Sequence, residues 1–201
     1  MRRYAACPEV CRRLDNPGLA IDMPIWVDHT RDETTVDQAR IEHALEGLGA
    51  VDRNLLHVGV GNSGFALRFA PVAHVVDGLT VSPAEKDLAD SLGIANYTVY
   101  LLSKYSRELV LTLQHRYDFV VDNNLASFAC CTFHFFRMLD SYVWCLRPGG
   151  RILTDQRGMD FTVEDDPRWR LTFDDLVGLG ELFPLSAERI TDTVYALRLA
   201  P

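Results

Sequence analysis

"NLLHVGVGNSG", residues 54–64, joins a short apolar strand to a glycine loop. Gly59, Gly61 and Gly64 in it match the pattern G-x-G-x-x-G. Glycines at the end of a strand let the backbone and the next helix N-terminus approach a ligand closely, because no Cβ atom stands in the way. The stretch therefore predicts a nucleotide-like cofactor loop after the first strand of a parallel sheet, without selecting the cofactor.

Strands and helices alternate after this loop. Apolar strands are expected at 54–60, 73–81, 97–102, 117–124 and 149–156. Two closing strands, 187–191 and 193–200, are joined by too few residues for a crossover helix and should pair antiparallel. The pattern predicts an α/β fold: a Rossmann-like, seven-stranded, mostly parallel sheet with an antiparallel C-terminal hairpin and helices on both faces.

The expected helices carry start and stop signals. One helix begins with Thr34 or Thr35 as its cap and stops at Gly49. Another has Ser82 as its cap, a proline at its first position and Glu85 three residues after the cap, which predicts a capping box. Further helices are expected at 63–71, 106–116, 129–146 and 172–183.

The composition is that of an ordinary globular protein, with 201 residues, 48% of them hydrophobic and 24% charged. The net charge of −8 argues against a nucleic-acid partner, which requires a basic surface. No apolar run approaches the roughly 18 residues that span a bilayer. The N-terminus also lacks a secretory signal, so we expect a cytoplasmic protein with no membrane partner.

Residues 1–38, rich in prolines and charges, are expected to form an arm or lid, and residues 39–201 the sheet domain. The five cysteines include no C-x-x-C pair and are expected to be reduced. Cys130 and Cys131 fall in an apolar run and are expected in the core. His134 lies among aromatic residues and is expected to be structural.

A second motif, "LRPGG" at 146–150, stands between the long helix and the fifth strand. With "LLHVGVGNSG", "VDGLTVSPAE" and "YDFVVDNN" in order before it, the chain from about residue 40 to 200 resembles the class I S-adenosylmethionine-dependent methyltransferases. The resemblance implies S-adenosylmethionine as cofactor and methyl transfer to an oxygen or nitrogen of a small-molecule acceptor. A homodimer is compatible with it.

The resemblance also implies which residues surround the cofactor: His57, Gly59, Gly61, Asn62, Gly64, Thr80, Ser82, Ser103 and Asn123. In the family, the positions of His57, Thr80 and Ser103 usually hold acids. A carboxylate can accept from both ribose hydroxyls, so its loss at position 80 should cost about 1–3 kcal/mol of binding. Asp77 compensates if the strand register differs by a residue or two, and Thr80→Asp should tighten binding.

The resemblance places the methyl acceptor at the end of the fourth strand, in the stretch "DNNLASF". We predict catalytic roles for Asp122 and Asn124 in this stretch, and for Tyr105 and His29, which are placed to reach the cavity. The segment "IDMPIWVDHT" is the candidate lid, and Trp26 within it is a candidate platform for the acceptor.

Three alternatives accompany this interpretation. Asp122 with Asp155 and Gln156 resembles the ligand set of metal-dependent catechol-type methyltransferases, but the flanking sequence differs and no metal is expected. The missing acids leave open a catalytically inactive methyltransferase-like binding module. An NAD(P)-dependent oxidoreductase would use Asp77 for the ribose and the Tyr100-x-x-x-Lys104 pattern, which here falls on a strand and not on one helix face.

Overall fold

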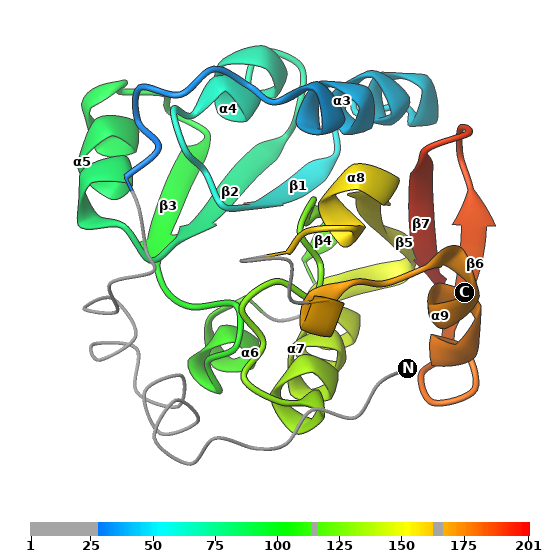
Figure 1. The fold of residues 1–201 in the computed structure, drawn as a ribbon. Coiled ribbons are helices and arrows are strands. Elements are labelled where there is room, and N and C mark those ends of the chain that lie inside the picture. The colour runs from blue at the N-terminus through cyan, green and yellow to red at the C-terminus, as the bar shows by residue number, and fades with distance from the viewer. Residues whose placement is uncertain (1–27, 114–115, 163–166) are drawn as a thin grey trace.

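The structure is a computed structural model that describes residues 28–113, 116–162 and 167–201 (Figure 1). Its strands are β1 (Asn54–Val58), β2 (Val75–Thr80), β3 (Tyr97–Leu101), β4 (Tyr117–Val121), β5 (Leu146–Asp155), β6 (Leu185–Arg189) and β7 (Val194–Leu199). They form one seven-stranded sheet in the order β3-β2-β1-β4-β5-β7-β6. β1 to β5 are parallel, and β7 pairs antiparallel with both β5 and β6. The expected fold class is confirmed.

The helices are α3 (Val36–Leu48), α4 (Gly64–Phe69), α5 (Pro83–Ser91), α6 (Glu108–Thr112), α7 (Thr132–Cys145), α8 (Gln156–Met159) and α9 (Phe173–Leu179), with a 3-10 turn η1 (Pro167–Trp169). Figure 1 shows α3, α4 and α5 on one side of the sheet and α6 and α7 on the other. Leu55 packs with α3 and α4, whereas Leu56 packs with α6, α7 and α9. Successive strand residues point to opposite faces, so strands covered on both sides are mostly apolar.

Local signals determine where the helices begin and end. Thr35 Oγ1 accepts from the backbone N–H of Gln38 at 3.4 Å, and Gly49 ends α3 in the left-handed region at φ 88°. Thr172 and Asp175 form a reciprocal capping box at the start of α9. Several helices are shorter than predicted: α6 covers only Glu108–Thr112, α7 begins at Thr132 and α9 ends at Leu179. The residues that precede α7 form turns, which carry part of the site described below.

Only part of the expected arm lies within the described residues. Residues 28–35 precede α3, and this helix continues across position 38, where the arm was expected to end. Trp26 and most of the candidate lid lie outside the described residues. The arm at 1–38 therefore stays a prediction.

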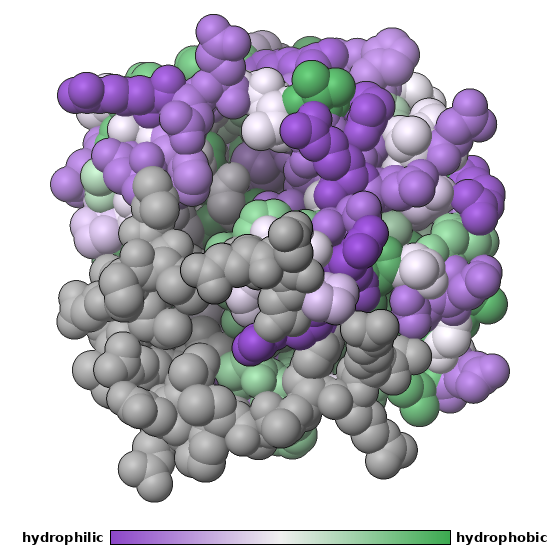
Figure 2. All heavy atoms as spheres, in the orientation of Figure 1, coloured by the Kyte–Doolittle hydropathy of each residue, from purple (hydrophilic) through white to green (hydrophobic). Residues whose placement is uncertain are grey.

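No helix among the described residues is both long and apolar enough to cross a membrane. Hydrophilic side chains gather over α3, α4 and α5 in the upper part of Figure 2. The large hydrophobic side chains exposed there and elsewhere, such as Leu67 and Val36, are scattered. Scattered exposed apolar residues are normal for a folded domain.

Candidate active site

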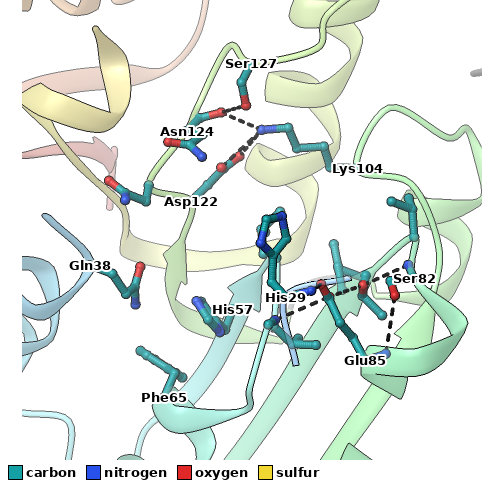
Figure 3. A pocket seen from close by; sticks show the side chains of 18 of the residues that line it. His29, Gln38, His57, Phe65, Ser82, Glu85, Lys104, Asp122, Asn124 and Ser127 are labelled. Atoms are coloured by element: carbon teal, nitrogen blue, oxygen red, sulfur yellow. Dashed lines mark hydrogen bonds and ion pairs between the residues drawn. The ribbon is translucent and has the colours of Figure 1, made fainter. Parts of the chain in front are cut away.

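A cavity of about 360 Å³ opens at the carboxyl ends of β1, β2 and β4 (Figure 3). Ligands of parallel α/β sheets bind at this edge, near the point where the strand order reverses. Every site residue predicted from the sequence lines the cavity, with the exception of Gly64. The four predicted catalytic residues and eight predicted cofactor-binding residues are therefore neighbours: His29, His57, Gly59, Gly61, Asn62, Thr80, Ser82, Ser103, Tyr105, Asp122, Asn123 and Asn124.

The glycines of the loop provide backbone conformations and space that other residues would not. Gly59 and Gly61 have φ values of +80° and +50°, in the left-handed region that L side chains rarely adopt. A Cβ atom on Gly59 would meet nothing within 4 Å, so open space lies above the backbone there. Gly64 does not face the cavity. A Cβ atom there would lie 2.9 Å from Asn62 Oδ1 and 3.0 Å from Thr34 Oγ1, so close packing requires a glycine at this position.

Glu85, the third residue of α5, is the main site residue that sequence reasoning missed. Its side chain is 4% exposed and lines the cavity. Oε2 accepts from Thr80 Oγ1 at 2.5 Å and from the Gly61 N–H at 3.3 Å, and Oε1 accepts from the His29 N–H at 3.3 Å. One carboxylate thus joins the end of β2, the glycine loop and the segment before α3 (Figure 3).

This arrangement corrects two predictions. The predicted capping box of α5 is only half formed: Ser82 Oγ accepts from the Glu85 N–H at 3.4 Å, but the Glu85 carboxylate turns to the cavity instead of returning to the cap. Thr80 was expected to stand alone in place of an acid, but its hydroxyl donates a hydrogen bond to the Glu85 carboxylate. An acid therefore stands at this end of β2 after all, supplied by the following helix.

Asp77 cannot serve as the acid at the cofactor. It is 1% exposed, and its Oδ2 accepts from the Tyr117 hydroxyl at 2.5 Å and from Arg116 at 3.1 Å, away from the cavity. Burial raises the pKa of this carboxyl, against the effects of Tyr117 and Arg116. The suggested compensation by Asp77 is wrong, and so is its use as the ribose acid of a dinucleotide site.

His57 occupies the cavity end of β1. Its ring stacks on Phe65 with centroids 4.4 Å apart. Burial lowers its pKa to about 4, so the imidazole is neutral at pH 7. Position 57 therefore offers a hydrogen bond to a ligand but no negative charge.

Lys104 and Asp122 form a buried ion pair between the ends of β3 and β4. Lys104 Nζ lies 2.9 and 3.1 Å from the two carboxylate oxygens of Asp122, and also donates to the carbonyls of Asn124 and Leu125 at 2.8 and 3.2 Å. The Tyr142 hydroxyl donates to the same carboxylate at 2.8 Å. Burial lowers the pKa of Lys104, while the Asp122 charge raises it. Three contacts hold Asp122, which fits a positioning residue better than a group that reacts directly.

The Tyr105 hydroxyl is likewise hydrogen-bonded within the protein. Its hydroxyl donates to the Ser127 carbonyl at 2.6 Å, and the ring is 1% exposed. Ser127 Oγ in turn donates to the Asn124 carbonyl at 2.8 Å. The backbone N–H of Tyr105 donates to Ser103 Oγ at 3.3 Å. These bonds fix the turn after β4 against the loop after β3, and they argue against Tyr105 as a proton acceptor.

The side chains of Asn62 and Asn123 are also engaged. Asn62 Nδ2 donates to the Asp32 carbonyl at 2.6 Å, and its Oδ1 accepts from the Gly64 N–H at 2.8 Å. Asn123 Nδ2 donates to the buried carboxylate of Asp37 at 2.5 Å. Both amides hold the walls of the cavity together.

His29 is the predicted catalytic residue best placed for proton transfer. Its imidazole stands in the cavity, on the side that faces Asp122 and Asn124 (Figure 3). Its Nδ1 lies 2.6 Å from Asp32 Oδ2, in a pair whose side chains are 55% and 65% exposed. A carboxylate on one ring nitrogen orients the ring and leaves the other nitrogen for a ligand.

The carboxylates of the catechol-type metal arrangement are separated by their partners. Asp155 is fully buried and bound by Arg40 through two bonds of 2.6 and 2.9 Å, whereas Asp122 is bound by Lys104. Gln156 lies in a different pocket and accepts from the Tyr195 hydroxyl at 3.2 Å. The described residues therefore do not bring these three side chains together at one centre.

No family model matches the sequence, and no curated protein does either. The fold, however, is similar to those of solved methyltransferases. The N-methyltransferase NodS from Bradyrhizobium japonicum, in complex with S-adenosylhomocysteine, is 17% identical with a TM-score of 0.58, and the similarity covers 95% of each chain. A SAM-dependent methyltransferase from Aquifex aeolicus is 12% identical with a TM-score of 0.56, over 96% of this chain and 98% of that one. DhpI, in its SAM-HEP complex, is 17% identical with a TM-score of 0.55, over 81% and 85%.

These similarities agree with the fold class expected from the sequence. The reversed strand β7 between β5 and β6 is the feature that the resemblance implied from the sequence. The chain has the fold of the class I S-adenosylmethionine-dependent methyltransferases.

Proposed function

We propose that this protein is an S-adenosylmethionine-dependent methyltransferase that acts on an oxygen or nitrogen of a small molecule. The observation that carries the proposal is the Glu85 carboxylate, buried beside the glycine loop and bonded to Thr80. It provides the acid that the sequence lacks at the end of β2. NodS was solved with S-adenosylhomocysteine and DhpI with SAM, which supports this cofactor for a chain of the same fold.

The residues present fit such a cofactor. The volume of about 360 Å³ lies within the range of roughly 300–1,000 Å³ that small-molecule sites occupy. The open space over Gly59 would take the part of the ligand that approaches the backbone, and Glu85 would accept from a ribose hydroxyl. A carboxylate has about four lone-pair positions, and three protein donors leave at least one for the ligand.

The cofactor, when bound, supplies a methyl group already activated on a sulfonium. The protein has then to orient the acceptor and remove its proton. His29 suits the second task, because Nδ1–H donating to Asp32 would leave the Nε2 lone pair directed into the cavity. The proton of the acceptor hydroxyl or amine passes to Nε2. Lys104 and Tyr142 hold Asp122 in place, where it shapes the acceptor side of the cavity.

Calorimetry with S-adenosylmethionine, S-adenosylhomocysteine and NADH tests the proposal directly. Saturable binding of the first two, without binding of NADH, is the expected result. Failure of both methionine derivatives at millimolar concentration would exclude the proposed function. A screen of small hydroxyl- and amine-bearing compounds for S-adenosylhomocysteine formation then separates an enzyme from an inactive binding module. Cytoplasmic location and a homodimer stay predictions.

A further inference from the structure

Two cysteines and a histidine meet at the start of α7, away from the cavity. Cys131 is the N-cap residue of this helix, and His134 is the third residue inside it. The Sγ atoms of Cys130 and Cys131 lie 3.1 and 3.3 Å from Nδ1 of His134 and 3.8 Å from each other. Neither cysteine forms a disulfide with another cysteine of the described chain. Sequence reasoning assigned these residues only to the core.

All three ligand atoms of this cluster lie close together. Both sulfur atoms approach the same Nδ1 atom, and they also approach each other. Three donor atoms that converge in this way surround a common centre, as the ligands of a metal ion do.

The distances agree with a tetrahedral zinc site. Zn–S bonds of about 2.3 Å and Zn–N bonds of about 2.0–2.1 Å at tetrahedral angles place two sulfurs about 3.8 Å apart and a sulfur and a nitrogen about 3.6 Å apart. The observed sulfur–sulfur distance is 3.8 Å, and the sulfur–nitrogen distances are 3.1 and 3.3 Å. A displacement of the His134 ring by roughly half an ångström or less completes the geometry.

We propose that Cys130, Cys131 and His134 form a Zn²⁺ site with water as the fourth ligand. Zn²⁺ binding converts two thiols to thiolates and releases two protons to solvent, while His134 binds through neutral Nδ1. Cys131 and His134 are buried, and the half-buried Cys130 provides the side from which an ion enters.

The test uses the full reduced chain, with Zn²⁺ binding followed by calorimetry and Co²⁺ binding by absorption. One equivalent should bind, with a thiolate-to-cobalt charge-transfer band. Cys130→Ser, Cys131→Ser and His134→Gln should each weaken binding by at least about 100-fold, since loss of a ligand exceeds the effect of outer-shell changes. Cys145→Ser is the matched control, because this buried thiol ends the same helix and should not change binding.

Two outcomes would overturn the proposal. One is the absence of micromolar Co²⁺ binding to the parent chain. The other is binding that persists in the Cys130→Ser/Cys131→Ser variant and disappears in a Cys7→Ser/Cys11→Ser variant. Circular dichroism in metal-free buffer checks the folding of each variant. Should a variant not fold, the alkylation rates of Cys130 and Cys131 in the parent chain decide instead, because bound Zn²⁺ should slow both.

Discussion

Glu85→Gln separates the charge of this side chain from its shape. The carboxylate accepts from Thr80, from the Gly61 N–H and from the His29 N–H. A glutamine keeps one acceptor oxygen and must turn an amide NH₂ toward the remaining donors. If the oxygen faces Thr80 and Gly61, the NH₂ group faces the His29 N–H, and donor meets donor.

The expected magnitude follows from these contacts. A hydrogen bond to a charged group is worth about 1.5–3 kcal/mol, and a neutral one about 0.5–1.5. The loss of charge toward the ribose should therefore cost about 1–3 kcal/mol, which raises the Kd for S-adenosylmethionine about 5- to 150-fold. The free energy of unfolding of the free protein should fall by only about 1 kcal/mol, because water in the cavity can replace part of the lost bonds.

Calorimetry measures the Kd for S-adenosylmethionine, and urea denaturation measures the free energy of unfolding. Asp87→Asn is the matched control, since it removes the same charge from an exposed position of α5 that does not line the cavity. Glu85→Asp keeps the charge but shortens the reach, and the two 3.3 Å contacts should then be lost. A Kd for Glu85→Gln within twofold of the parent value, or equal to that of Asp87→Asn, would refute a cofactor contact of Glu85.

Four further predictions concern other residues of the site. Thr80→Asp should weaken cofactor binding, contrary to the expectation from sequence. The new carboxylate would stand beside that of Glu85, because Thr80 Oγ1 lies 2.5 Å from Glu85 Oε2. Tighter binding in calorimetry would contradict this prediction. Gly61→Val should abolish cofactor binding and cost about 1–2 kcal/mol or more in unfolding free energy, since φ is +50° and L side chains rarely adopt this conformation. Unchanged affinity would mean that the loop is not the cofactor loop. Burial lowers the pKa of His57 in the folded state to about 4. Between pH 6.5 and 4 only the unfolded chain therefore takes up a proton at this histidine, and the free energy of unfolding falls as the pH falls through that window. In urea denaturation between pH 7 and 4.5, the parent should lose about 2 kcal/mol more than His57→Gln, and equal losses would contradict a buried neutral ring. His29→Ala should lower kcat by about 10²- to 10⁴-fold and leave the cofactor Kd within twofold, whereas an unchanged rate in the methyl-transfer assay would exclude it as the base.

Most of the fold could be predicted from local signals. Strand-to-helix alternation, the caps Thr35 and Thr172 and the short link before β7 depend on residues close together in sequence. The strand ends also predicted the site, because the carboxyl ends of parallel strands converge at one edge of the sheet. Gly64 is the one predicted site residue that does not line the cavity, because the G-x-G-x-x-G pattern does not say which way each glycine faces.

The partners of charged side chains could not be predicted in this way. Glu85 had a sufficient local explanation as a capping residue, and Lys104 matched a motif of a different fold. Each instead bonds to groups distant in sequence: Glu85 to His29, 56 residues away, and Lys104 to Asp122, 18 residues away. The signal available for Glu85 was its place five residues after Thr80, directly past a strand end with a Ser-Pro turn between them.

"HVGVGNSG" by itself determined that a strand ends in a loop able to approach a ligand, because left-handed φ values at Gly59 and Gly61 are a local property of the backbone. With "LRPGG" and the order of the strands, it determined the sheet and the edge at which the cavity opens. Only the tertiary structure decided which charged side chains face that cavity and which are paired with an opposite charge elsewhere. The reason is that a buried carboxylate takes whichever donors packing brings within about 3 Å, and those donors come from distant segments of the chain.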